Sequence, residues 1–89
     1  MKIEYNCRVC GFYYSDPPWG MDNKTPSYEI CDCCGVEFGY EDSTLNGIIR
    51  YREKWIKEGA IWFNPDCKPA DWNLDDQLMH VLSKYRKTI

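Results

Sequence analysis

Cys7-Arg8-Val9-Cys10-Gly11 opens the cysteine-rich half of the chain, and Cys31-Asp32-Cys33-Cys34-Gly35 repeats its pattern. Together they read C-x2-C-x20-C-x2-C, with a glycine after the last cysteine of each pair. Two residues between cysteines allow a tight turn that aims both sulfurs at one point, and glycine takes the positive φ that such a turn often requires. Two such turns bring four thiolates into a tetrahedral metal site. The predicted metal ligands are Cys7, Cys10, Cys31 and Cys34.

The spacing does not select the metal, because a tetrahedral site of four sulfurs accepts zinc or iron. We expect Zn²⁺, with iron as the alternative. Zinc held by four thiolates has no open coordination position and therefore activates no water. The expected role is structural, in a protein-interaction or adaptor module without enzymatic activity. Iron in the same site would instead indicate an electron carrier.

The segment between the two cysteine pairs has the composition of short strands and turns. Phe12-Tyr13-Tyr14 is strand-like, and Ser27-Tyr28-Glu29-Ile30 leads into the second pair. Between them, Asp16-Pro17-Pro18-Trp19-Gly20 interrupts any regular element. We expect two short antiparallel hairpins that meet at the metal, an arrangement typical of a zinc ribbon.

Two resemblances accompany this pattern. Tyr5-x-Cys7-x-x-Cys10-Gly11-x-x-Tyr14 and Cys34-Gly35-Val36 look like the two cysteine knuckles of rubredoxins. Residues 3–42 more closely resemble the cysteine-rich CPCC family, a group of small bacterial proteins of unknown function. The stretches that carry this second likeness are Cys10-Gly11-Phe12, Asp16-Pro17-Pro18, Ser27-Tyr28-Glu29-Ile30-Cys31 and Cys34-Gly35. The resemblances imply a metal site and a rubredoxin-like ribbon, and they imply no activity.

Two cysteines lie outside the predicted ligand set. Cys33 can exchange with Cys34, but Gly35 follows Cys34, which favours Cys34 as the ligand and leaves Cys33 a free thiol pointing away from the ion. Cys67 stands alone, and we expect it to be a small buried apolar residue. The alternative is that Cys33 and Cys67 form a redox pair.

Two helices are expected in the second half of the chain. Asp42-Ser43-Thr44 offers N-caps for a helix over about 44–58, which Gly59 ends. Asn73 caps a second helix over about 74–87, with a narrow apolar stripe along one face. The one histidine, His80, lies opposite this stripe, where we expect it to be solvated.

Arg52 and the loop over 60–72 each allow two main interpretations. Arg52 falls within the apolar arc of the first predicted helix, so its stem packs along the surface with its head in solvent, or it pairs with Glu37 or Glu41. A ligand-binding role for Arg52 is a third possibility. The loop is rich in Trp and Pro. It either packs as a satellite core that ties the helices together or offers an aromatic platform to a partner protein.

Charge and composition narrow the class of protein. The net charge is −3, and residues 1–46 hold three basic and eight acidic side chains. Nucleic-acid binding depends on Lys and Arg neutralising phosphates, so we expect no nucleic-acid partner. The short apolar runs predict no membrane span. The sequence begins without a signal peptide, which predicts a cytoplasmic protein with reduced cysteines.

These observations predict an α+β fold in one compact domain. Residues 1–42 are expected to form a rubredoxin-like zinc ribbon, and residues 43–89 a helical extension with two α-helices packed against it. The 89-residue chain builds only a small core, and scaffolds of this size usually add a staple such as a metal. The expected partner is another protein, and the sequence sets no oligomeric state.

Overall fold

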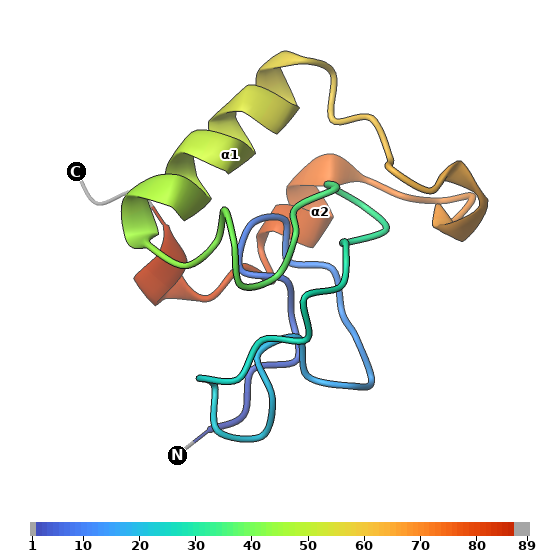
Figure 1. Cartoon of the computed structure of the whole chain (residues 1–89). Helices are drawn as coiled ribbons and strands as arrows, with labels where there is room; N and C mark the ends of the chain where they lie inside the picture. The colour runs from blue at the N-terminus through green and yellow to red at the C-terminus, as the bar shows by residue number, and fades with distance from the viewer. Residues whose placement is uncertain (1, 87–89) are drawn as a thin grey trace.

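A computed structural model describes residues 2–86 of the chain. Its longest element is the helix α1 (Leu45–Lys57), followed by the short helix α2 (Leu74–Leu78). Two single-turn 3₁₀ helices, η1 (Pro65–Cys67) and η2 (Ser83–Tyr85), flank α2 in the sequence. The described residues before α1 form turns and extended chain, which lie beneath α1 in the view of Figure 1.

The predicted zinc ribbon is wrong as a description of the fold. Residues 2–86 form no β-sheet, because their β pairing is confined to two isolated antiparallel bridges, Asn6 with Tyr13 and Ile30 with Glu37. Each cysteine turn closes within one such bridge, and the pairing continues only as a single backbone hydrogen bond outside it, from Tyr14 to Tyr5 and from Phe38 to Glu29. The prolines that follow the first turn lack the N–H groups that a ladder needs. The rubredoxin-like hairpins expected over residues 1–42 are therefore two compact turns and an irregular loop.

The first predicted helix is confirmed. Thr44 is its N-cap, and the Thr44 Oγ1 atom accepts a hydrogen bond from the Gly47 N–H at 3.0 Å. Gly59 follows the helix with φ 106°, the left-handed conformation that commonly ends helices. Ile48 and Trp55, with 1% and 6% of their surface exposed, are the α1 residues that enter the core.

The second predicted helix is wrong beyond Leu78. Asn73 caps α2 as expected, but the helix ends after five residues, and residue 87 of the predicted span lies outside the described residues. The Arg86 guanidinium donates to the carbonyl of Leu78 at 3.1 Å and to that of Val81 at 2.9 Å. These bonds satisfy carbonyls that a longer helix would have paired internally, and the bend allows Val81 to be buried.

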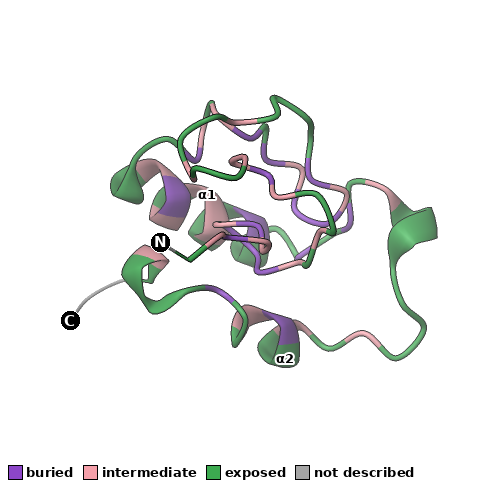
Figure 2. Ribbon diagram, turned by 90° about the horizontal axis from the view of Figure 1, so that it is seen from below, coloured by how far each residue is buried: buried purple, intermediate pink, exposed green. Residues whose placement is uncertain are grey.

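The core is built largely from the cysteine turns themselves. In Figure 2 the buried residues gather in the irregular loops and along one face of α1, while most of the chain around α2 is exposed. α1 and the loop over 60–72 pack onto these turns and share one hydrophobic cluster with them. Its buried members are Cys7, Val9, Cys10, Cys31, Cys33, Cys34, Val36, Phe38, Ile48, Trp55, Ala60 and Trp62.

Candidate metal centre

The first cysteine turn, residues 5–14, is here called the first knuckle. The Cys7 N–H donates to the Phe12 carbonyl at 2.8 Å, and the Gly11 N–H donates back to the Cys7 carbonyl at 2.9 Å. Gly11 has φ 84°, as the sequence pattern predicts. The chain therefore reverses around Cys7 and presents both cysteines of the pair on the inside of the turn.

The second cysteine turn, residues 29–38, is the second knuckle, and it has the same hydrogen bonds. The Cys31 N–H donates to the Val36 carbonyl at 2.8 Å, and the Gly35 N–H donates to the Cys31 carbonyl at 2.9 Å. Gly35 has φ 81°. The two knuckles therefore correspond residue by residue, and each delivers two sulfurs to the space between them.

The structure brings together all four cysteines that the sequence singled out. Their Sγ atoms lie within 4.8 Å of one another, and all four side chains are buried. The Cys7 and Cys34 sulfurs are 3.8 Å apart, and the Cys10 and Cys31 sulfurs are 3.7 Å apart. Four sulfurs in a tetrahedron at a Zn–S bond of about 2.3 Å would be separated by about 3.8 Å. The cluster therefore has the donor set and the dimensions to hold one metal ion.

Four thiolates do not coexist in this space without a cation. Burial raises the pKa of Cys7, and it raises those of Cys10 and Cys34 well above the usual range. Burial also acts against ionisation of Cys31, but hydrogen bonds from Cys10, Cys34, Cys7 and Tyr14 outweigh it and lower the Cys31 pKa. Ionising all four cysteines in this buried space is therefore unfavourable without a counter-charge, and a bound divalent cation would favour the ionised form of all four.

Tyr14 contacts the cluster, a role that was not predicted from the sequence. Its hydroxyl donates to the Cys31 Sγ at 3.2 Å and accepts from the Asp32 N–H at 2.9 Å. The corresponding position of the second knuckle is Phe38, which packs edge-on against the Tyr14 ring at 5.6 Å and carries no hydroxyl. The Tyr14 hydroxyl thus orients the Cys31 thiol and stabilises negative charge on its sulfur.

Arg52 of α1 is bound to backbone carbonyls, which differs from all three interpretations of the sequence. Its guanidinium donates to the carbonyls of Val9 at 2.6 Å, Arg8 at 2.9 Å and Tyr85 at 2.7 Å. No ion pair with Glu37 or Glu41 is found among the described residues. The side chain therefore fastens the first knuckle to α1 and to the C-terminal segment, and it brings a positive charge close to the thiols.

Gln77 of α2 is a second contact that sequence reasoning missed. Its Nε2 donates to the Cys10 carbonyl at 3.2 Å and to the Cys33 sulfur at 3.1 Å, and its Oε1 accepts from the Trp72 indole N–H at 2.8 Å. A polar residue in a helix carries no signal for such a role. Only the packing of α2 against the knuckles reveals it.

The two remaining cysteines differ in exposure. Cys33 is fully buried and stands where the first knuckle has Val9, which is also fully buried. It is a free thiol outside the four-sulfur cluster, as expected. The expectation that Cys67 is buried is wrong, because this free thiol lies in the exposed helix η1. With one thiol in the core and the other on the surface, the structure contains no Cys33–Cys67 redox pair.

The loop over 60–72 holds the second knuckle through its backbone and divides between core and surface. The N–H groups of Phe63 and Asn64 donate to the carbonyls of Cys33 at 3.0 Å and Asp32 at 2.8 Å. Trp62 is buried in the core, whereas Phe63 is 60% exposed. Trp62 therefore packs in the core, as the first interpretation expects, and the role of this loop as a platform for a partner protein stays a prediction.

Two curated proteins of Bacillus subtilis (strain 168) are similar to this chain. The uncharacterized protein YoaQ is 31% identical over 84 aligned residues, which cover 75% of this chain and 70% of YoaQ. The uncharacterized protein YozI is 28% identical over an alignment 90 positions long, which covers 83% of this chain and 74% of YozI. No family model matches the chain, and no solved structure matches it. Among the described residues, no helix has the length and apolar character needed to cross a membrane.

Proposed function

This chain belongs to the same family as the uncharacterized Bacillus subtilis protein YoaQ, and we propose that it is a small metal-binding protein with a structural Zn²⁺ site. One observation carries the proposal. Across the two knuckles, the Cys7 and Cys34 sulfurs lie 3.8 Å apart and the Cys10 and Cys31 sulfurs lie 3.7 Å apart. Both distances are close to the edge of about 3.8 Å that a ZnS₄ tetrahedron has. The proposed ligands are Cys7, Cys10, Cys31 and Cys34.

The proposed role of the ion is to hold the fold together. The four ligands are themselves part of the hydrophobic core, and no β-sheet joins the two knuckles within residues 2–86. A metal ion shared between the knuckles would supply the link that backbone pairing does not. In small zinc domains the binding free energy, about 10–16 kcal/mol, is also folding free energy.

We propose no catalytic role for this site. Four thiolates complete the coordination of Zn²⁺ and leave no position for water or substrate. The burial of all four ligands supports this interpretation, because a reacting molecule has no access to the ion.

Iron is the alternative metal, since the same four sulfurs accept it. An iron site would carry one electron and would colour the protein through thiolate-to-iron absorption. Metal analysis and the visible spectrum distinguish the two ions.

The wider role that we propose is protein interaction, in the cytoplasm. Free thiols that lie close together, as in this cluster, persist in a reducing compartment. Membership of the CPCC family is part of the same proposal and rests on the motifs of residues 3–42.

The proposal is tested by metal analysis of the full chain, expressed once with added zinc and once with added iron. We expect about one zinc per chain and no visible colour in both preparations. Removing the metal with a strong chelator should abolish the cooperative unfolding transition, and adding Zn²⁺ back should restore it. Cys10→Ser should lose the metal, and the control Cys67→Ser should keep it, because Cys67 lies on the surface away from the cluster.

Three results would contradict the proposal in different ways. A chain that binds no metal in either medium has no such site. A metal-free chain that still unfolds cooperatively would make the ion dispensable for folding. About one iron per chain with visible absorption would replace the structural interpretation with electron transfer.

A further inference from the structure

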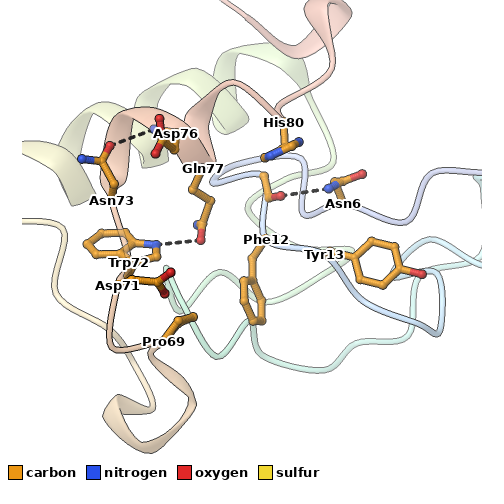
Figure 3. Close-up of a pocket in the computed structure, with 11 residues that line it drawn as sticks. Asn6, Phe12, Tyr13, Pro69, Asp71, Trp72, Asn73, Asp76, Gln77 and His80 are labelled. Carbon is orange, nitrogen blue, oxygen red and sulfur yellow. Dashed lines mark hydrogen bonds between the residues drawn. The ribbon is translucent and has the colours of Figure 1, made fainter.

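An open groove lies beside the first knuckle, between that knuckle and α2. Its volume is about 490 Å³, within the range of roughly 300–1,000 Å³ that is typical of ligand sites. Gly11 and Phe12 line one side, and the segment from Pro69 to His80 lines the other (Figure 3). The groove is larger than one side chain needs, so it can accommodate a short stretch of polypeptide.

Aromatic rings with fixed positions form part of the groove wall. The Trp72 indole N–H donates to Gln77 Oε1 at 2.8 Å, and the Trp72 ring packs edge-on against Trp62 with centroids 5.6 Å apart. Phe12 packs edge-on against the same Trp62 at 5.2 Å. Both rings are therefore held by the core rather than free to turn, and they form a preorganised surface for a ligand.

The charge of the groove is negative. Asp71 and Asp76 are among the eleven lining residues, and none of the eleven is a lysine or an arginine. Within residues 2–86, no hydrogen bond or ion pair engages either carboxylate. In Figure 3 the carboxylate of Asp71 lies between the rings of Trp72 and Phe12. His80, exposed as the sequence predicts, stands at the far end of the groove.

Trp72 already attracts a cation from its own chain. The Lys68 Nζ atom lies 5.1 Å from the centroid of the Trp72 ring, within the distance at which an aromatic face attracts a positive charge. A ring with this property, two unpartnered carboxylates and a lining without lysine or arginine together match one kind of ligand. That ligand is cationic, with a flat or apolar body.

We propose that this groove binds an arginine side chain presented by an extended segment of a partner protein. Arginine fits best because its planar guanidinium stacks on aromatic rings and pairs with a carboxylate through two parallel hydrogen bonds. The inference rests on the proposed function, since Gly11 directly follows the proposed ligand Cys10 and Gln77 ties the groove to the Cys10 carbonyl at 3.2 Å. The metal site would thus hold one wall of the docking site in place.

The test is a titration of the zinc-loaded full chain with two short blocked peptides, followed by the NMR signal of the Trp72 indole N–H. One peptide has a single central arginine, and the other has citrulline, which keeps the shape and lacks the charge. We expect saturable shifts with the arginine peptide and about tenfold weaker binding of the citrulline peptide. Asp71→Asn with Asp76→Asn should weaken arginine binding about tenfold.

Asp75→Asn is the matched control. Asp75 lies in the first turn of α2 like Asp76 but does not line the groove. This variant lowers the negative charge of the same helix turn, and it should leave binding unchanged.

Several outcomes would overturn the inference. Equal binding of both peptides would mean that only shape or apolar contact matters, and equal loss in the Asp75→Asn control would mean non-specific charge attraction. Absence of saturable shifts would mean that the groove is not a binding site for arginine. Shifts that follow protein concentration without peptide would mean that a second copy of this chain occupies the groove. Metal analysis distinguishes this failure from that of the proposed function, because a zinc-loaded, cooperatively folded chain that ignores the peptide contradicts only the docking proposal.

Discussion

The two knuckles have the same backbone hydrogen bonds, but the rest of the molecule holds them by different means. The carbonyls of the first knuckle accept from two long side chains, Arg52 of α1 and Gln77 of α2. Those of the second knuckle accept from the backbone N–H groups of Phe63 and Asn64. A repeated local motif therefore does not need a repeated environment. The first knuckle depends on the identity of particular side chains, whereas the second depends on the course of a loop.

The largest effect is expected where the knuckles should behave alike, at the ligands themselves. Cys10→Ser and Cys34→Ser each remove the last cysteine of one pair. Both should lose the metal and the cooperative unfolding transition, because binding and folding share a free energy of about 10 kcal/mol or more. Metal analysis and far-UV circular dichroism check this expectation. If one variant kept a full complement of metal, the two knuckles would not contribute equally, and the four-thiolate assignment would be wrong.

Alanine substitution of the glycine that follows each cysteine pair should destabilise the two knuckles to different extents. Gly35→Ala should cost about 1–2 kcal/mol, the usual penalty of a left-handed residue with a Cβ atom. The added atom would come no closer than 3.4 Å to its neighbours, the Phe63 side chain and the Tyr51 hydroxyl. Gly11→Ala adds a clash, since its Cβ would lie 2.6 Å from the Gln77 carbonyl oxygen. Its total cost should be about 2–5 kcal/mol.

Urea unfolding of the two zinc-loaded alanine variants measures this difference. Equal losses at the two positions would mean that α2 moves away without cost, and that the first knuckle does not depend on its contact with α2.

Arg52→Met tests the side-chain support of the first knuckle directly. The variant keeps an apolar stem and removes the charged donor from three carbonyls. We expect a loss of about 2–4 kcal/mol in unfolding free energy, because a hydrogen bond from a charged group contributes about 1.5–3 kcal/mol net and the three bonds of one side chain do not add in full. Arg50→Met, on the exposed face of the same helix, is the control and should stay within about 0.5 kcal/mol. Similar losses in the two variants would mean that the overall charge of α1 matters, and not the hydrogen bonds from Arg52 to the first knuckle.

The smallest effect is expected from making the knuckles more alike. Cys33→Val places in the second knuckle the residue that occupies the corresponding buried position of the first, Val9. Metal content should not change, and the unfolding free energy should change by less than about 1.5 kcal/mol, since the swap nearly conserves volume and loses one weak contact to Gln77. A fall in metal content would make Cys33 a ligand.

The sequence predicted those features that are encoded by a few neighbouring residues. The C-x2-C pairs with their glycines predicted the knuckle geometry and the four cysteines that cluster, because spacing and positive φ act within a single turn. Thr44 and Gly59 bounded α1 for the same reason, since capping is local.

The features that the sequence missed depend on contacts between distant segments. Phe12-Tyr13-Tyr14 has strand composition, yet the rings of Phe12 and Tyr14 pack against the core and Tyr13 is exposed, and no ladder extends through them. α2 stops early because Arg86 satisfies the carbonyls at its end. Gln77 binds the first knuckle only because α2 packs there. No periodicity or spacing within the chain reports such contacts.

X-ray absorption at the zinc edge tests the central claim most directly, because it measures the ligands of the metal bound to the intact chain. The account predicts four sulfur neighbours at about 2.3 Å and no oxygen or nitrogen neighbour. Fewer than four sulfurs, or any light-atom ligand at about 2.0 Å, would mean that the two knuckles do not close one site between them.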